Sequence, residues 1–404
     1  MVSVGSHHSC GIINDGSIWC WGANRFPGIL GLGDPEILDL CGDYDTQCSY
    51  RPRRVTGITA AVNLSVGPFH TCTILGDDSI WCWGLNTSGQ LGNGTLDSTS
   101  VPTSVTSMDD AIEVSVGGSH SCAIRSDGSL WCWGENSAGQ LGIGAGPEFC
   151  TSDATAFACS KVPVEIPLPS AAVSISSSTF HSCAVTVGGD TYCWGSDYAN
   201  QLGVVNLQDC PGGAGICWLP ELITGISDAV EVYTSLWHTC IRAYNGSVWC
   251  WGHLDFSGAD VANGLDSCDQ RYNTDNCTSI PGIVLPGEAT RISSRASLWP
   301  HTCALVVSET VCWGANYAGQ LGDGTTTYQQ YPVPVAGPSG FISISAGDVN
   351  TCGVSADGSA WCWGSNTYGR LGTDDKDGPG QCNSSLYQGP CSTIPVRVAN
   401  PYNE

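Results

Sequence analysis

Short runs of alternating apolar and polar residues recur along the chain and predict β-strands joined by tight turns. Residues 122–125 form one such run, residues 130–134 form the next, and Asp127-Gly128 lies in the turn between them. An Asp-Gly pair between two strands is a strong hairpin signal, because glycine adopts the positive φ that the turn needs. Counting outward from this turn places Cys122 opposite Cys132, at a spacing that a disulfide bridges after modest closing.

The same hairpin recurs along the whole chain. Aligning the motifs H-[ST]-C and C-W-G gives seven copies, each with one pair of cysteines. A histidine stands two residues before the first cysteine in six copies, and Asn350 takes this place in the seventh. The predicted hairpin disulfides are Cys10–Cys20, Cys72–Cys82, Cys122–Cys132, Cys183–Cys193, Cys240–Cys250, Cys303–Cys312 and Cys352–Cys362.

Each copy contains two further predicted strands. One precedes the histidine, as at 114–116, and the other follows an N-x-x-G-Q-L-G-like turn and contains proline, as at 162–166. Proline suits an edge strand, where no N–H is needed for a ladder hydrogen bond. Seven units of four strands predict an all-β, seven-bladed β-propeller that forms a single domain over 1–404. We place the blade cores near 2–33, 64–94, 114–144, 173–203, 230–264, 292–324 and 342–372.

The two ends of the chain suggest how the ring closes. The first copy has no Pro-bearing strand before it, whereas such a strand, 394–398, follows the last copy. We therefore expect the C-terminal strand to complete the first blade, which would remove exposed sheet edges. In the W-C-W strands, residues i and i+2 share a face, so both indoles should pack on one neighbouring blade while the cysteine points the other way.

Composition narrows the functional classes. The 404 residues include 13 Lys and Arg against 37 Asp and Glu, a formal charge of -24, which disfavours nucleic-acid binding. Insertion into a membrane is not expected, because the sequence holds no apolar run of about 18 residues. The 24 cysteines never show C-x-x-C spacing, which favours disulfides over a metal site. We therefore expect a secreted or cell-surface protein.

A second set of cysteines lies in long linkers between the Q-L-G turn and the Pro-bearing strand. These linkers occur in five copies, whereas the second and sixth copies have short linkers without cysteine. Loops on a rigid scaffold commonly carry binding sites, so we expect these inserts to gather on one face and contact other proteins. The alternative is that the disulfides of these inserts only protect exposed loops from proteolysis. The predicted insert disulfides are Cys41–Cys48, Cys150–Cys159, Cys210–Cys217, Cys268–Cys277 and Cys382–Cys391.

The combination of G-x-x-H-[ST]-x-A, D-G-x-[VIL]-[WY]-x-W-G and N-x-x-G-Q-L-G resembles the repeat of the regulator-of-chromosome-condensation family. The resemblance covers essentially all seven copies and implies a seven-bladed propeller. Members of this family include exchange factors, ubiquitin-ligase modules, inhibitors of secreted enzymes and extracellular scaffolds, so the repeat implies the fold rather than the function. The acidic charge, the cystine-linked hairpins and the lack of a basic tail indicate a secreted relative.

Three further residue patterns bear on metal binding and glycosylation. The six repeated histidines are expected to be structural, each hydrogen-bonding within its own blade, because one per blade is too dispersed to share a metal ion. The acidic run 374–378 offers oxygen ligands for Ca²⁺ but lacks the closing glutamate of an EF-hand, so a solvated loop is preferred. Among the N-x-[ST] sequons, Asn93, Asn276 and Asn383 are the better candidates for glycosylation.

No catalytic constellation is evident in the sequence. Paired cysteines leave no thiol as a nucleophile, and neither G-x-S-x-G nor a phosphate-binding loop occurs. We expect neither an enzyme nor a cofactor, but a binding scaffold or structural subunit that contacts extracellular proteins, or copies of itself, through the stapled inserts. One alternative is a carbohydrate-binding propeller that uses Trp218, Trp237 and Trp299. Another, by family analogy, is a secreted inhibitor of an enzyme.

Overall fold

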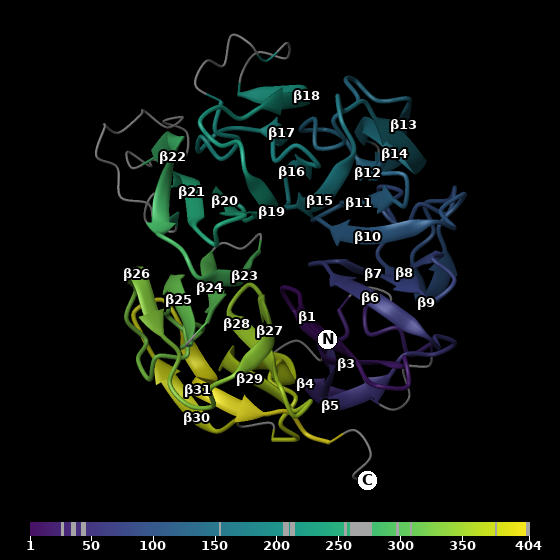
Figure 1. Ribbon diagram of the computed structural model, residues 1–404. Coiled ribbons are helices and arrows are strands. Elements are labelled where there is room, and N and C mark those ends of the chain that lie inside the picture. Colours follow the sequence, from purple (N-terminus) through teal and green to yellow (C-terminus); the bar gives the residue numbers. More distant parts are fainter. Residues whose placement is uncertain are drawn as a thin grey trace.

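The computed structural model describes residues 1–25, 28–33, 38–41, 46–152, 155–204, 210, 215–253, 257–258, 277–295, 299–307, 309–375 and 378–400. Seven antiparallel sheets of four or five strands stand around a central axis (Figure 1). The prediction of an all-β, seven-bladed propeller is confirmed.

Each blade is given from its innermost strand outward. The first three blades comprise β1 (Val2–Val4), β2 (His8–Ile12), β3 (Ile18–Ala23), β5 (Thr46–Arg54) and β4 (Asp39–Cys41); β6 (Ala61–Val66), β7 (His70–Leu75), β8 (Ile80–Gly84) and β9 (Thr99–Ser104); and β10 (Ala111–Val116), β11 (His120–Arg125), β12 (Leu130–Glu135), β14 (Thr155–Ile166) and β13 (Glu148–Ser152). The next two comprise β15 (Ala172–Ser177), β16 (His181–Thr186), β17 (Thr191–Ser196) and β18 (Ile216–Leu222); and β19 (Ala229–Thr234), β20 (His238–Ala243), β21 (Val248–His253) and β22 (Cys277–Leu285). The last two comprise β23 (Ala289–Ser294), β24 (His301–Val306), β25 (Thr310–Gly314) and β26 (Gln329–Pro334); and β27 (Phe341–Ala346), β28 (Asn350–Ser355), β29 (Ala360–Ser365), β31 (Gln388–Arg397) and β30 (Gly380–Asn383).

The innermost strands form a closed circle. Each contacts the innermost strand of the next blade in the order β1, β6, β10, β15, β19, β23 and β27, and β27 contacts β1. Serine hydroxyls link neighbouring members of the circle: Ser65 Oγ accepts a hydrogen bond from the Val116 N–H at 3.0 Å, and Ser345 Oγ accepts one from Val4 at 3.0 Å. The serines of the Val-Ser-Val pattern therefore connect blades rather than simply facing solvent.

The predicted partner of the C-terminal strand was wrong. β31 pairs with β29 of the seventh blade, and the first blade takes its outer strand, β5, from its own repeat. Each blade is therefore one continuous segment of the chain. The C-terminal strand still contributes to closure through its side chains, because Val396 and Val398 pack in the apolar cluster that holds Trp21 of the first blade.

The repeated hairpin has the predicted register. Cys122 pairs with Cys132 across β11 and β12, and His120 pairs with Gly134. Gly134 has a φ of 104°, and a Cβ on this residue would lie 2.7 Å from the Cα of His120. Glycine is therefore required in C-W-G, both for its backbone conformation and for the close approach of the two strands.

Indoles fill the spaces between blades, as the W-C-W pattern predicts. Trp133 of the third blade is fully buried in a cluster with Cys72, Leu91 and other apolar residues of the second. Cys122 and Cys132 lie on the opposite face of the third blade, in a cluster with Trp194 of the fourth. A strand that is apolar on both faces is what burial between two blades needs.

The repeated histidines connect blades through Nε2, so the expectation that each hydrogen-bonds within its own blade was wrong for that atom. It holds for Nδ1 in two of them, because His181 Nδ1 lies 2.7 Å from Ser178 Oγ and His238 Nδ1 lies 2.9 Å from Ser235 Oγ of the same blade. Each of the repeated histidine side chains lies at the start of its strand, points toward the next blade and contacts a hydroxyl group there. The Nε2 atoms lie 2.6–3.0 Å from these oxygens in the pairs His8–Thr71, His70–Ser121, His120–Ser182, His181–Thr239, His238–Thr302 and His301–Thr351. Asn350 Nδ2 completes the circle by donating to Ser9 Oγ at 3.5 Å.

Candidate binding face

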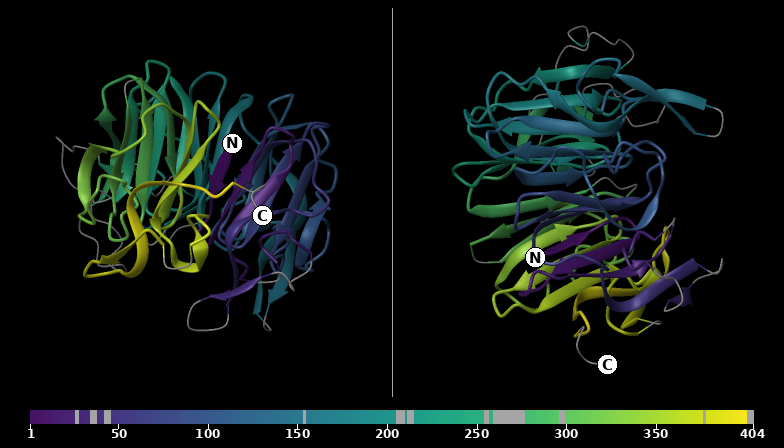
Figure 2. Two further views of the ribbon diagram at one scale, coloured as in Figure 1. Left: turned by 90° about the horizontal axis from the view of Figure 1, so that it is seen from below. Right: turned by 90° about the vertical axis from the view of Figure 1, so that its right-hand side faces the viewer.

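The insert hairpins that the structure describes, in the first, third and seventh blades, leave the ring from the same end. His120 pairs with Gly134, so the C-W-G strand ends beside the histidine, and the chain enters the insert there. The hairpins β4–β5, β13–β14 and β30–β31 all extend downward from the ring in Figure 2 (left). We call this end of the ring the insert face. The opposite end, which carries the turns at Asp127 and Tyr244, is the turn face.

Disulfides close the inserts. The structure contains Cys41–Cys48, Cys150–Cys159, Cys210–Cys217 and Cys382–Cys391 in addition to the seven hairpin disulfides. Cys277 is disulfide-bonded, whereas its predicted partner Cys268 lies outside the described residues. The part of the chain that the structure describes contains no free thiol.

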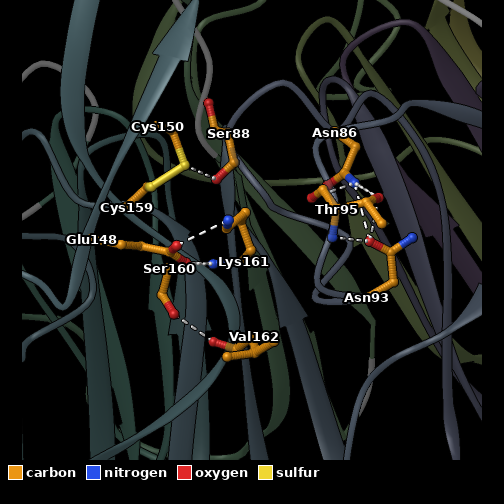
Figure 3. Close-up of polar contacts among 10 residues, drawn as sticks. All are labelled: Asn86, Ser88, Asn93, Thr95, Glu148, Cys150, Cys159, Ser160, Lys161 and Val162. Carbon is orange, nitrogen blue, oxygen red and sulfur yellow. Dashed lines mark hydrogen bonds and ion pairs between the residues drawn. A yellow bond between two sulfur atoms is a disulfide. The ribbon is translucent and has the colours of Figure 1, made fainter.

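The insert of the third blade rests on the second blade (Figure 3). Cys150 Sγ lies 4.0 Å from the carbonyl oxygen of Ser88, in the N-x-x-G turn of the second blade. Glu148 holds the strand that follows, accepting a hydrogen bond from the Lys161 N–H at 2.7 Å and pairing with its Nζ at 3.1 Å. Gly89 is needed beneath this strand, because a Cβ there would lie 2.8 Å from the Cα of Lys161.

The seventh insert repeats this arrangement on the sixth blade. Cys382 Sγ lies 3.6 Å from the carbonyl oxygen of Ala318, which occupies the same turn position as Ser88. Sequence reasoning missed these contacts, because the spacing of an insert disulfide does not show which blade it meets. The inserts of the third and seventh blades thus rest on the preceding blade, and the β13–β14 hairpin reaches beyond the rest of the ring in Figure 2 (right).

Apolar side chains are exposed on these inserts. Leu40 on β4 is 67% exposed and Phe149 on β13 is 74% exposed, each immediately before an insert cysteine. Leu386, beside β30, is 52% exposed. Exposed apolar residues on rigid, protruding elements are suited to bury area against a partner.

The three tryptophans proposed as sugar platforms are half-buried. Trp237 packs against Ala199 and Cys277, and Trp299 meets Tyr317 edge to face, with ring centroids 6.2 Å apart. Trp218 lies against the neighbouring blade, where its carbonyl oxygen accepts a hydrogen bond from Gly144 at 3.0 Å. The fold therefore does not bring these indoles together as one exposed platform.

The candidate glycosylation sites differ in accessibility. Asn383 is exposed next to an insert cysteine, whereas Asn93 is half-buried and its Oδ1 accepts a hydrogen bond from Thr95 Oγ1 at 2.9 Å. Asn276 lies outside the described residues. Asn86 is fully buried, and its Nδ2 donates to the Thr95 carbonyl at 3.1 Å.

Asp374, the first residue of the acidic run proposed for Ca²⁺, lies at the seam between the first and seventh blades, whereas residues 376–377 of the run lie outside the described residues. Asp374 pairs with Arg51 at 2.8 Å, and its backbone N–H donates to the Tyr50 carbonyl at 2.9 Å. Within the described ranges, no three His, Cys, Asp or Glu side chains are grouped as metal ligands.

Burial shifts the pKa values of the titratable side chains inside the ring. It lowers the pKa of His8, His70, His120, His181, His238 and His301 to about 3, so all six are neutral at physiological pH. It also raises the pKa of Glu113 to about 8 and that of Asp197 to about 7. None of these groups lies beside a free thiol in the described part of the chain. No described helix has the length and apolar character needed to cross a membrane.

Comparison with known proteins agrees with this architecture. The sequence model of the RCC1-like domain family matches residues 38–387. That of the regulator of chromosome condensation (RCC1) repeat matches residues 2–26. The ultraviolet-B receptor UVR8 of Arabidopsis thaliana is 30% identical over 215 residues, covering 52% of this chain and 44% of that protein. The probable E3 ubiquitin-protein ligase HERC6 of Homo sapiens is 27% identical, covering 49% of this chain and 19% of the ligase.

Two solved structures show the same fold. Yeast RCC1 (Prp20), in its complex with Kap60, superposes with a TM-score of 0.70 at 19% identity, covering 99% of this chain and 86% of that one. Human WBSCR16 gives a TM-score of 0.69 at 18% identity, covering 88% and 86%. The fold and the repeat define a propeller in which each blade contains a cystine-linked hairpin. The chain belongs to the RCC1-like family, and it spans less than half the length of the two curated relatives that it matches above.

Proposed function

We propose that this protein is a non-catalytic extracellular scaffold that binds other proteins through its insert face. The observation that carries the proposal is the anchoring of stapled hairpins on the preceding blade, at Cys150–Ser88 and Cys382–Ala318, while Phe149 and Leu40 stay exposed. A rigid base lowers the entropy lost on binding, because the contact residues are already ordered.

The extracellular setting rests on the disulfides. Cystine bonds in every blade persist in an oxidising compartment and are rare where thiols are kept reduced. The relatives support protein binding only in general terms: yeast RCC1 (Prp20) was solved bound to Kap60. HERC6 is named a ligase, but this chain matches 19% of it, so no ligase activity is proposed here.

The test compares the two faces of the ring. The native chain, an insert-face variant (Leu40→Ser with Phe149→Ser) and a turn-face variant (Val187→Ser with Tyr244→Ser) are immobilised and exposed to extracellular proteins of the source. The turn-face pair is a matched control because Val187 and Tyr244 are 70% and 85% exposed. We expect the insert-face variant to lose at least tenfold of specific partner binding and the turn-face variant to retain it. Equal binding by both variants, or equal loss, would contradict the proposal.

A further inference from the structure

A pocket lies at the seam where the first and seventh blades meet. Its volume is about 380 Å³, within the size range of small-molecule sites. The insert hairpin of the first blade and the loop after η4 (Thr367–Gly369) of the seventh blade supply its walls. The described residues that line it are Asp39, Leu40, Tyr50, Arg51, Arg53 and Asp374.

The two arginines of the pocket have different surroundings. Arg51 is already paired, since its Nε and Nη2 atoms lie 2.9 and 2.8 Å from Asp374 Oδ1. Among the described residues no carboxylate pairs with Arg53 in this way, and its buried Nε has no hydrogen-bond partner there. A buried donor that lacks an acceptor is costly, and the cost is larger for a charged group. Arg53 therefore brings to this pocket a guanidinium that no carboxylate of the described residues neutralises, and an incoming anionic acceptor would pair with it.

A ligand with a single carboxylate group is the best acceptor for Arg53. A guanidinium matches the planar geometry of a carboxylate through parallel N–H donors. A doubly charged phosphate would be repelled by Asp39 and Asp374, which line the same pocket. Those two carboxylates accept hydrogen bonds, so they suit a ligand that also carries hydroxyl groups. Four of the six described lining residues are charged, which disfavours an apolar peptide side chain.

We propose that this seam pocket binds a sugar acid, with its carboxylate on Arg53 and its hydroxyl groups donating to Asp39 and Asp374. The site is separate from the exposed apolar tips proposed to bind proteins, except for Leu40, which belongs to both. Because the pocket includes residues from the first and seventh blades, a bound ligand would also tie the seam of the ring together.

The test is a saturation-transfer NMR titration of the intact chain with glucuronate, glucose and glutamate. We expect glucuronate to bind at least tenfold more tightly than either other compound. The Arg53→Gln variant should lose at least tenfold of this affinity. Arg54→Gln is the matched control, because Arg54 is adjacent, exposed and absent from the pocket lining, and it should bind as the native chain does.

Three outcomes would overturn the proposal. The first is equal binding of glucose, and the second is tighter binding of glutamate, which would assign the pocket to a zwitterion. The third is undiminished glucuronate binding in Arg53→Gln. Should Arg53→Gln fail to fold, as judged by its unfolding temperature, Arg53→Lys preserves the charge without the planar fork and should still weaken binding. The comparison of the three compounds on the native chain needs no variant.

Discussion

The Nε2 atom of His70 lies 2.7 Å from the Oγ atom of Ser121 on the next blade. Ser121 Oγ in turn donates to the carbonyl oxygen of Gln90 at 3.0 Å, so its hydroxyl proton is already used. His70 must therefore be the donor, which places its proton on Nε2 and leaves Nδ1 as an acceptor. The same relay occurs where Ser182 donates to Gln140 and Thr351 donates to Gln320.

This ring of neutral histidines makes stability depend on pH. The pKa of the buried imidazoles is about 3, below the ordinary value of 6.5, so the unfolded chain binds more protons between these values. The free energy of unfolding should therefore fall as pH drops from 6.5 toward 3, by about 1.4 kcal/mol per pH unit for each histidine. Glu113 and Asp197 act in the opposite sense, because their raised pKa values let the folded chain keep two protons that the unfolded chain releases.

Denaturant unfolding between pH 4 and 8 measures this dependence. The His120→Asn variant should show a shallower slope below pH 6.5 by one proton, since Asn350 already fills the equivalent position in the seventh blade. An unchanged slope would mean that His120 is charged in the folded ring.

The two indoles of a W-C-W strand should differ in their contribution to stability. Trp133 is fully buried between blades, and its Nε1 donates to the Gln90 carbonyl at 2.9 Å. Trp131 is half-buried, with Arg125 over its ring at 4.4 Å. We expect Trp133→Ala to lower the free energy of unfolding by about 3–5 kcal/mol and Trp131→Ala by clearly less. Equal losses in urea unfolding would contradict the burial of Trp133.

The glycine of C-W-G should resist substitution more than a glycine in an open turn. Gly134 combines a φ of 104° with the close approach to His120, whereas Gly57 has a φ of 76° and a Cβ there would meet nothing within 4 Å. Gly57→Ala should cost about 1 kcal/mol for backbone strain alone. Gly134→Ala should cost more than that in thermal or urea unfolding, and similar values would show that the two strands separate easily.

The oxidation state is open to a direct measurement. If all 24 cysteines are paired, the intact mass without reduction should lie 24 hydrogens below that of the reduced chain. The same sample should react with no alkylating reagent until a reductant is added. Substantial labelling before reduction would argue against the extracellular setting proposed here.

The repeat made the blades predictable, because the Asp-Gly turn, the paired cysteines and the C-W-G strand recur at nearly constant spacing. The outer strand of the first blade was missed because Tyr50-Arg51-Pro52-Arg53-Arg54 is too charged to resemble its apolar counterparts. Without it, the strand at 394–398 seemed to be left over for the first blade. The same charged segment proved to line the seam pocket.

Contacts between blades were harder to predict than contacts within them. Local spacing shows which residues share a face of a strand, but not which neighbour that face meets. The His70–Ser121 and Cys150–Ser88 contacts join segments more than 50 residues apart, and they follow from the curvature of the ring. The inserts were predicted from their cysteines, whereas their anchoring on the preceding blade required the three-dimensional structure.

The continuity of each blade has an evolutionary corollary. None of the seven described sheets borrows a strand from the opposite end of the chain, so a duplication or deletion of one repeat adds or removes a complete sheet. No strand pairing in the described sheets requires that the chain begin at a particular blade. A circularly permuted gene opened between two repeats would therefore still encode seven whole sheets. Rings of this construction can change their size and their starting point in single genetic steps.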